Sequence, residues 1–230
     1  KPQRPSRFLA PTNPPAMGRH ALAALLAGLT TRCVHSRRAL VVIDMSVGQW
    51  AGITYRAEPT LATIRRLMSN VSEPFFDLVL DSRLAMSCGA PEQSTICEMR
   101  WPKAAEEVRL LPELRFPHAT HVAKRSYSAF VDSSLDATLR VAGIEEVYLV
   151  GINTNYCIFA SALSAWERAY QVRVVLDGVT SCDGESGHAD GLKMLETFFV
   201  RSSSTRRVRL LHSRDIPPLA ARRRPELLLE

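Results

Sequence analysis

The sequence predicts an α/β protein of three layers, in which helices cover both faces of an open, mostly parallel, twisted sheet of about six strands. The first observation is a set of short apolar runs, such as residues 39–45, that lack polar alternation and suit strands buried on both faces. The second is that these runs alternate with segments whose apolar residues recur at helical spacing. Such alternation implies parallel strands joined by right-handed crossovers.

The expected elements follow one another from residue 39. Strands are predicted over 39–45 and 76–81, and the helix between them, over 59–71, has an apolar stripe that includes Leu61, Ile64 and Leu67. Later strands are predicted over 121–124, 146–151, 172–177 and 208–211, and later helices near 135–142, 156–170 and 187–200. Gly143 is expected to end the first of these helices. The Gly- and Pro-containing stretch 82–118 is predicted to be a long excursion with one short helix near 104–110.

Composition and charge indicate a folded core between basic ends. An apolar content of 46% over 230 residues is that of an ordinary packed domain. The net charge of +6 comes from the ends, because residues 44–200 carry 20 acidic and 14 basic residues. A nucleic-acid-binding surface would place its basic residues on the periodic elements of the core, so we expect no nucleic-acid partner.

The chain divides into an N-terminal extension over 1–38, one α/β domain over 39–212 and a basic tail over 213–230. The extension contains an apolar run, 21–29, that is far shorter than the ~20 residues of a membrane-spanning helix, so no membrane partner is expected. Because it is basic and free of acidic residues, the extension resembles an organelle presequence or a weak signal segment, and a plain extension of a cytosolic protein is the alternative. Five cysteines without a CxxC pair favour an intracellular location, in the cytoplasm, or in the mitochondrion if the extension is a presequence.

Polar residues at the predicted strand ends are the candidates for a functional site, because ligands of open parallel sheets bind beyond the carboxyl ends of the strands. These residues are Asp44, Asp81 with Arg83, Lys124, the 151–157 turn, and Asp177 with Ser181. The sequence has no GxGxxG after the first strand, no P-loop motif and no GxSxG elbow. Dinucleotide binding, P-loop phosphate binding and the usual serine hydrolase therefore lose their main support.

An acid, a lysine and a cysteine at three separate strand ends suit nucleophilic catalysis. Cys157 is predicted at a helix start, where the helix dipole and a neighbouring Lys124 would lower the pKa of its thiol. Asp44 could take the thiol proton and later deliver it to a leaving amine. From these residue types alone, a buried inert cysteine and a capping aspartate stay open as alternatives.

Four blocks resemble motifs of the isochorismatase-like cysteine hydrolases, which have a Rossmann-like α/β fold. They are the first strand 40–45 (LVVIDM), the lysine motif 124–130 (KRSYSAF), the nucleophile motif 147–157 (VYLVGINTNYC) and the block 177–181 with His188. The resemblance implies that Asp44 is the general acid/base, Lys124 its electrostatic partner and Cys157 the nucleophile. All four blocks lie inside the predicted domain, 39–212.

The resemblance also implies a backbone feature at the nucleophile. A cis peptide is expected between Ile152 and Asn153, and the N–H groups of Asn153 and Cys157 are expected to form the oxyanion hole. An ordinary strand-to-helix turn, capped by Asn153 and Asn155, is the alternative.

Departures from the family pattern concern metal and substrate. Nicotinamidase-like members carry a metal site that begins with Asp-x-His, whereas this chain has Asp81-Ser-Arg83, so neither a metal nor another cofactor is expected. Arg83 is expected to pair with a substrate carboxylate, or alternatively with Asp81 or loop carbonyls. Gln49, Trp50 and Tyr127 are the other expected substrate-binding residues.

The sequence therefore predicts a metal-independent cysteine hydrolase that cleaves a C–N bond of a small amide or ureido/carbamoyl compound through a covalent thioester. A small-molecule substrate and a homo-oligomer, a dimer or tetramer, are expected. One alternative is a catalytically inert protein that keeps the fold for interaction. The other is a nicotinamidase with an altered metal site.

Overall fold

The computed structural model describes residues 36–69, 75–84, 105–201 and 207–216. The expectations for residues 1–35, for the 85–104 part of the excursion and for 217–230 lie outside the described residues. Within the described residues the chain forms a six-stranded, all-parallel sheet of order β3-β2-β1-β4-β5-β6. The strands are β1 (Arg37–Ile43), β2 (Leu78–Leu84), β3 (Ala119–Lys124), β4 (Ile144–Ile152), β5 (Gln171–Thr180) and β6 (Val208–Leu211). This confirms the predicted α/β class with an open parallel sheet.

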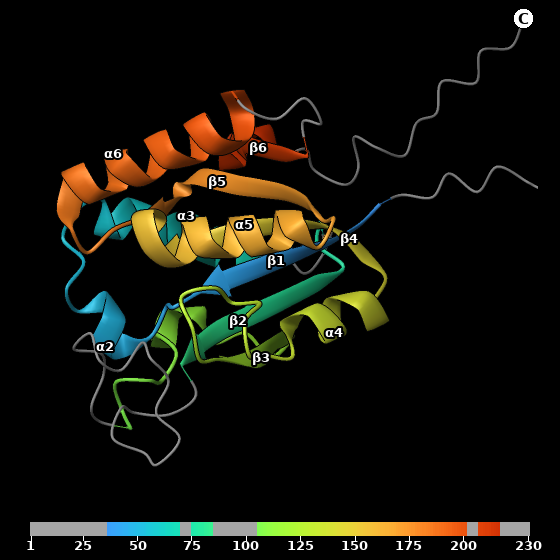
Figure 1. The fold of residues 1–230 in the computed structure, drawn as a ribbon. Helices are drawn as coiled ribbons and strands as arrows, with labels where there is room; N and C mark the ends of the chain where they lie inside the picture. The colour runs from blue at the N-terminus through green and yellow to red at the C-terminus, as the bar shows by residue number, and fades with distance from the viewer. Residues whose placement is uncertain (1–35, 70–74, 85–104, 202–206, 217–230) are drawn as a thin grey trace, which may run out of the picture. The chain divides into compact units, whose positions relative to one another are not determined.

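Helices cover both faces of the sheet, as Figure 1 shows with α5 in front of the strands and α3 behind them. Alternate residues of β1 point to opposite sides, so Val41 packs with the core under α4 (Leu135–Val141), α5 (Phe159–Glu167) and α6 (Gly184–Leu195), and Leu40 packs with α3 (Ala57–Ser69). Gly143, with φ of 65°, ends α4 as the sequence predicts. Strands are added on one side of β1 as far as β3 and then on its other side from β4 onward, so the carboxyl ends of β1 and β4 form the topological switch point of the sheet.

Some element boundaries differ from the prediction. Strand β1 begins at Arg37, two residues inside the predicted extension, and the turn Ser213–Asp215 lies in the predicted tail. Strand β5 continues to Thr180, so Asp177 is not at a strand end. Its carboxylate instead accepts hydrogen bonds from the backbone N–H and the hydroxyl of Ser213, which removes Asp177 from the candidate site.

The short helix expected near 104–110 does not form over its described part, 105–110. The carbonyl groups of Glu107 and Arg109 accept hydrogen bonds from the backbone N–H groups of Gly48 and Val47, each over 2.9 Å. Leu110 then pairs with Ser46 in an antiparallel bridge. These bonds to a distant segment of the same chain occupy carbonyl groups that would accept the internal hydrogen bonds of a helix. The 105–110 segment therefore lies along the short helix α2 (Val47–Trp50) instead.

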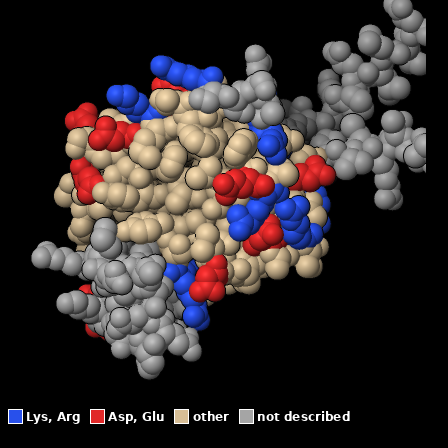
Figure 2. Space-filling model, in the orientation of Figure 1, with Lys and Arg blue, Asp and Glu red and all other residues tan. Residues whose placement is uncertain are grey.

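Charged side chains on the drawn face are mixed in sign. Figure 2 shows a largely uncharged centre with acidic and basic groups interspersed at its border. In the part of the chain that the model describes, no helix is long and apolar enough to cross a membrane.

A buried charge network joins the amino ends of three strands. Glu146 on β4 accepts a hydrogen bond from Arg38 Nε on β1 over 2.9 Å, and it forms an ion pair with Arg173 Nε on β5 over 2.7 Å. All three side chains are less than a tenth exposed. Each carboxylate oxygen has one guanidinium partner, so removal of Glu146 would leave two buried cations without their counter-ion.

We expect Glu146→Ala to lower the free energy of unfolding by about 3–5 kcal/mol, the usual loss when one member of a buried ion pair is removed. Glu145→Ala is the matched control, because Glu145 is the exposed neighbour on the same strand and its loss should cost within about 0.5 kcal/mol. Urea unfolding followed by circular dichroism measures both. Equal stabilities of the two variants would contradict the role assigned to the network.

Candidate active site

Three side chains meet at the carboxyl end of the sheet. Lys124, the last residue of β3, donates a hydrogen bond to Asp44 Oδ2 over 2.7 Å, and its Nζ lies 3.5 Å from Cys157 Sγ. The side chains of Lys124 and Asp44 have no solvent exposure, and Cys157 has none either. The acid, lysine and cysteine that the sequence places on separate strands thus form one buried cluster.

The position of Asp44 depends on an unusual backbone. Its φ is 57°, in the left-handed region that few non-glycine residues adopt, and its N–H donates to the carbonyl of Ser82 over 2.9 Å. Gly151 on β4 has φ of 116°, and a Cβ at this position would lie 2.0 Å from the carbonyl oxygen of Ile43. The close approach of β4 to the end of β1 therefore requires glycine, and it brings the turn that carries Cys157 beside Asp44.

Cys157 lies in a π-helical turn, η3 (Thr154–Ile158), which precedes α5. This differs from the α-helix predicted from residue 156. The N–H groups of Tyr156 and Ile158 both donate to the carbonyl of Asn153, over 3.0 and 3.1 Å. The peptide bond between Ile152 and Asn153 is cis. The Asn153 side chain does not cap the turn but accepts a hydrogen bond from the N–H of Cys182 over 2.8 Å.

Helix α6 holds the turn from outside. His188, which is buried, has its Nδ1 2.9 Å from the Thr154 hydroxyl, and this hydroxyl donates to the carbonyl of Thr180 over 3.0 Å. A Cβ on Gly191 would lie 2.6 Å from the backbone of Thr154, so only glycine permits this contact between α6 and the turn. His188 therefore packs and positions the turn.

The electrostatics differ from the prediction at Cys157. Burial and the Asp44 carboxylate raise the pKa of the thiol, and the Lys124 ammonium opposes them without prevailing. The expectation that a helix start and Lys124 would lower this pKa is therefore wrong. Burial by itself lowers the pKa of Lys124, but the Asp44 carboxylate and the hydrogen-bonding contact with the sulfur of Cys157 outweigh it and raise that pKa above its usual value.

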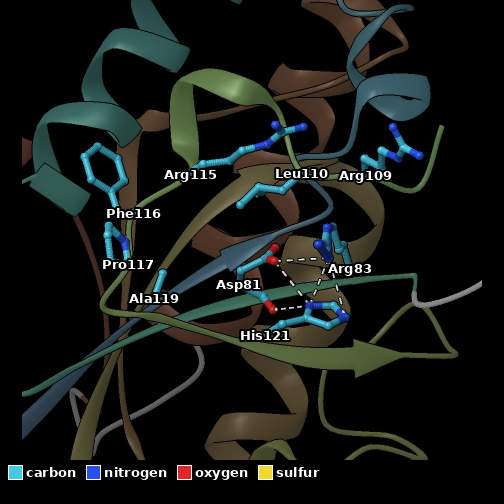
Figure 3. Close-up of a pocket in the computed structure, with 9 residues that line it drawn as sticks. All are labelled: Asp81, Arg83, Arg109, Leu110, Arg115, Phe116, Pro117, Ala119 and His121. Carbon is cyan, nitrogen blue, oxygen red and sulfur yellow. Dashed lines mark hydrogen bonds and ion pairs between the residues drawn. The ribbon is translucent and has the colours of Figure 1, made fainter. Parts of the chain in front are cut away.

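Arg83 lies on β2 with partners of its own. Its Nη1 is 3.1 Å from Asp81 Oδ2 and 2.9 Å from His121 Nδ1 on β3. These three residues line a cavity of about 510 Å³ together with the 109–117 segment (Figure 3). The pairing with Asp81 is the alternative that the sequence left open for Arg83.

The other expected substrate-binding residues occupy different positions. Gln49 is buried on α2 and accepts a hydrogen bond from the Ser46 hydroxyl over 2.9 Å. Trp50 packs against the core on the α3 side. The ring of Tyr127 lies 6.1 Å from that of Tyr156, the residue before Cys157.

Sequence reasoning missed the contribution of His121, Arg109 and Arg115 to the cavity around Arg83. His121 is 40 residues from Asp81 in the sequence, but it lies directly opposite Asp81 in the register of β2 and β3. The alternation of β3 could have indicated that its side chain shares a face with that of Asp81. Nothing in the sequence indicated that the 109–117 segment covers this face.

Comparisons with known proteins agree with this fold. The model of the isochorismatase domain matches residues 38–207. A ureidoacrylate amidohydrolase, RutB, of Methylobacterium radiotolerans is 32% identical over 111 residues, which are 47% of this chain and 42% of that protein. The chain thus spans less than half the length of this curated relative in the match.

Solved structures show the same fold. The N-carbamoylsarcosine amidase of Thermoplasma acidophilum has a TM-score of 0.61 at 22% identity, over 76% of this chain and 96% of that one. The nicotinamidase PncA of Bacillus subtilis has a TM-score of 0.57 at 21% identity, over 70% and 94%. The family model covers most of the described strands and helices, and it includes Asp44, Lys124 and Cys157. The chain therefore belongs to the isochorismatase family.

Proposed function

We propose that this protein is an amidohydrolase that cleaves a C–N bond of a small amide or ureido/carbamoyl compound, with Cys157 as nucleophile. The observation that carries the proposal is the buried contact of Lys124 with both Asp44 and Cys157. The names of the relatives support the same chemistry, because ureidoacrylate amidohydrolase, N-carbamoylsarcosine amidase and nicotinamidase all describe hydrolysis of C–N bonds.

In the first step the sulfur of Cys157 attacks the carbonyl carbon of the substrate. Because the pKa of the thiol is raised, the resting group keeps its proton at neutral pH and must lose it during the attack. Asp44 accepts that proton, since its Oδ1 is buried without a hydrogen-bond partner among the described residues. The Lys124 ammonium stabilises the negative charge that develops on the sulfur as its proton leaves.

Collapse of the tetrahedral intermediate then breaks the C–N bond. Asp44 delivers its proton to the leaving nitrogen, and the acyl group stays on Cys157 as a thioester. Water next attacks the thioester while Asp44 takes a proton from it; the C–S bond then breaks, Asp44 returns this proton to the sulfur of Cys157, and the acid is released. The N–H groups of Asn153, which precedes the turn, and of Cys157, within it, are proposed to hold the oxyanion in both steps.

Two further side chains are proposed to contact substrate. The Nε2 of Gln49 is a buried donor without a partner among the described residues. Gln49 lies on α2, five residues after Asp44 in the sequence. An acceptor oxygen on the substrate would satisfy this donor. Tyr127 lies beside the turn that carries Cys157 and is proposed to pack its ring against the substrate. Trp50 packs against the core next to Gln49 and is not proposed to contact the substrate.

The residues of the second strand do not fit a metal site of the nicotinamidase kind. The guanidinium of Arg83 already contacts both Asp81 and His121, the two side chains that would have to bind a cation. His118 instead lies 2.8 Å from the carbonyl of Met68 through Nε2. Within the described residues no three His, Cys, Asp or Glu side chains gather as a ligand set. We therefore propose catalysis without a metal.

We expect Cys157→Ala to lower ammonia release from the best substrate by at least ~10³-fold, because the attacking group is lost. The search for that substrate is a screen of small amides, ureas and carbamoyl amino acids. Asp44→Asn should be nearly as inactive, since an amide cannot carry the proton. Cys182→Ala is the control and should keep its activity, and thermal unfolding verifies that each variant folds. Substantial turnover by folded Cys157→Ala protein would refute the assignment.

Thiol labelling tests the electrostatics of the resting site. Cys157 is fully buried and its thiol pKa is raised, whereas Cys182 is exposed. Without substrate at pH 7.5, iodoacetamide should modify Cys182 roughly tenfold faster than Cys157, as measured by mass spectrometry of the digested protein. Faster labelling of Cys157 would mean that it is a preformed thiolate, and Asp44 would then not be needed to deprotonate it.

Chelation tests the absence of a metal from the mechanism. After dialysis against EDTA, activity on the same substrate should be unchanged, because Arg83 supplies the positive charge beside Asp81. A loss of activity that Zn²⁺ restores would show that a metal site exists and would contradict this part of the proposal.

A further inference from the structure

The cavity beside Arg83 has the volume of a small-molecule site. Its volume of about 510 Å³ lies within the range of such sites. Strands β2 and β3 contribute Asp81, Arg83 and His121, and the 109–117 segment lies across from them with Arg109 and Arg115 (Figure 3). Apolar side chains complete the wall, namely Leu110, Phe116, Pro117 and Ala119.

The charges of the cavity favour an anion. Three arginines face a single carboxylate, that of Asp81, so the lining carries an excess of two positive charges when His121 is neutral. Arg83 is partly compensated by Asp81, but no carboxylate among the described residues lies within ion-pair distance of Arg109 or Arg115. Planar guanidinium groups bind carboxylates through paired hydrogen bonds, and the apolar wall suits the carbon skeleton of an organic acid.

Two polar atoms of the residues that line the cavity lack partners. Arg83 Nε and Asp81 Oδ1 are both buried without a hydrogen bond to the described residues, and Asp81 is only 2% exposed. Buried polar groups in this condition usually serve a ligand or an ordered water. An oxygen of the ligand would satisfy Arg83 Nε, and an N–H or O–H group of the ligand would satisfy Asp81 Oδ1.

The contacts of His121 also leave a place for an acceptor. Its Nδ1 lies 2.9 Å from Arg83 Nη1 and 3.2 Å from Asp81 Oδ2. One ring nitrogen cannot accept from the arginine and donate to the aspartate at the same time. A ligand oxygen that accepts from Arg83 would relieve this competition and leave His121 to donate to Asp81.

We propose that this cavity binds the carboxylate of a small organic acid. It lies next to the active-site elements, because Ser82 accepts the N–H of Asp44, Leu84 pairs with Lys124, and Leu110 bridges to Ser46. The acid is either the carboxylate end of the substrate, which rests on the proposed function, or a separate molecule bound beside it. The chemistry of recognition is the same in both cases.

Calorimetric titration of succinate into the full-length protein at low salt tests the proposal, since succinate has no hydrolysable bond. We expect saturable binding that Arg83→Gln and Arg115→Gln each weaken about tenfold or more. Arg65→Gln is the matched control, because Arg65 is exposed on α3 and away from the cavity lining. The neutral analogue 1,4-butanediol should not bind.

Arg115 is exposed, so its substitution should leave folding intact even if Arg83→Gln does not fold. Absence of saturable succinate binding by the unmodified protein would overturn the proposal. Equal weakening by Arg65→Gln and Arg115→Gln would overturn it as well, since the effect would then be one of net charge.

A second titration identifies the source of the acid. N-carbamoylglycine is titrated into the Cys157→Ala protein with and without saturating succinate. Competition would assign the cavity to the substrate carboxylate, and independent binding would assign it to a separate acid; both outcomes support a carboxylate site. Succinate binding does not require catalysis, so a protein without amidase activity that binds succinate would refute the proposed function and leave this inference standing.

Discussion

The carboxyl end of the sheet depends on the ion pair between Lys124 and Asp44. Each charge is removed from water, which costs several kcal/mol per ion, and only a close partner offsets that cost. The two residues come from β3 and from the end of β1, with β2 between those strands. The pair therefore joins the edge of the sheet to its centre, and it does so where Cys157 Sγ lies 3.5 Å from the same ammonium.

The same burial decides how the cysteine can act. A thiol in an exposed, electropositive site becomes a thiolate before substrate arrives. Here the low-polarity surroundings and the Asp44 carboxylate act against the charged sulfur, and Lys124 is already engaged by that carboxylate. In the proposed mechanism deprotonation is therefore coupled to attack, with Asp44 taking the proton and Lys124 stabilising the charge on the sulfur.

Arg83 stands where nicotinamidase-like members have a histidine, and this difference changes the chemistry of the cavity beside the strand ends. An imidazole at this position would offer a metal ligand, whereas a guanidinium is a permanent cation that contacts Asp81 and His121 itself. With Arg109 and Arg115 on the facing segment, the cavity is suited to anions. The Lys124–Asp44 cluster and this cavity lie at the same end of the sheet but differ in their electrostatics. The cluster is a buried ion pair, whereas the cavity has an excess of positive charge.

The sequence alone determined the α/β class, because continuous apolar strands between amphipathic helices have few alternatives to a covered parallel sheet. It also indicated Asp44, Lys124 and Cys157, since side chains at parallel strand ends gather at one edge. The tertiary structure alone decided the state of the thiol, because burial is a sum over surroundings that lie far apart in the chain. It decided as well that residues 105–110 bind along α2 and that 109–117 faces Arg83, because those contacts join segments whose own patterns carry no information about their partners.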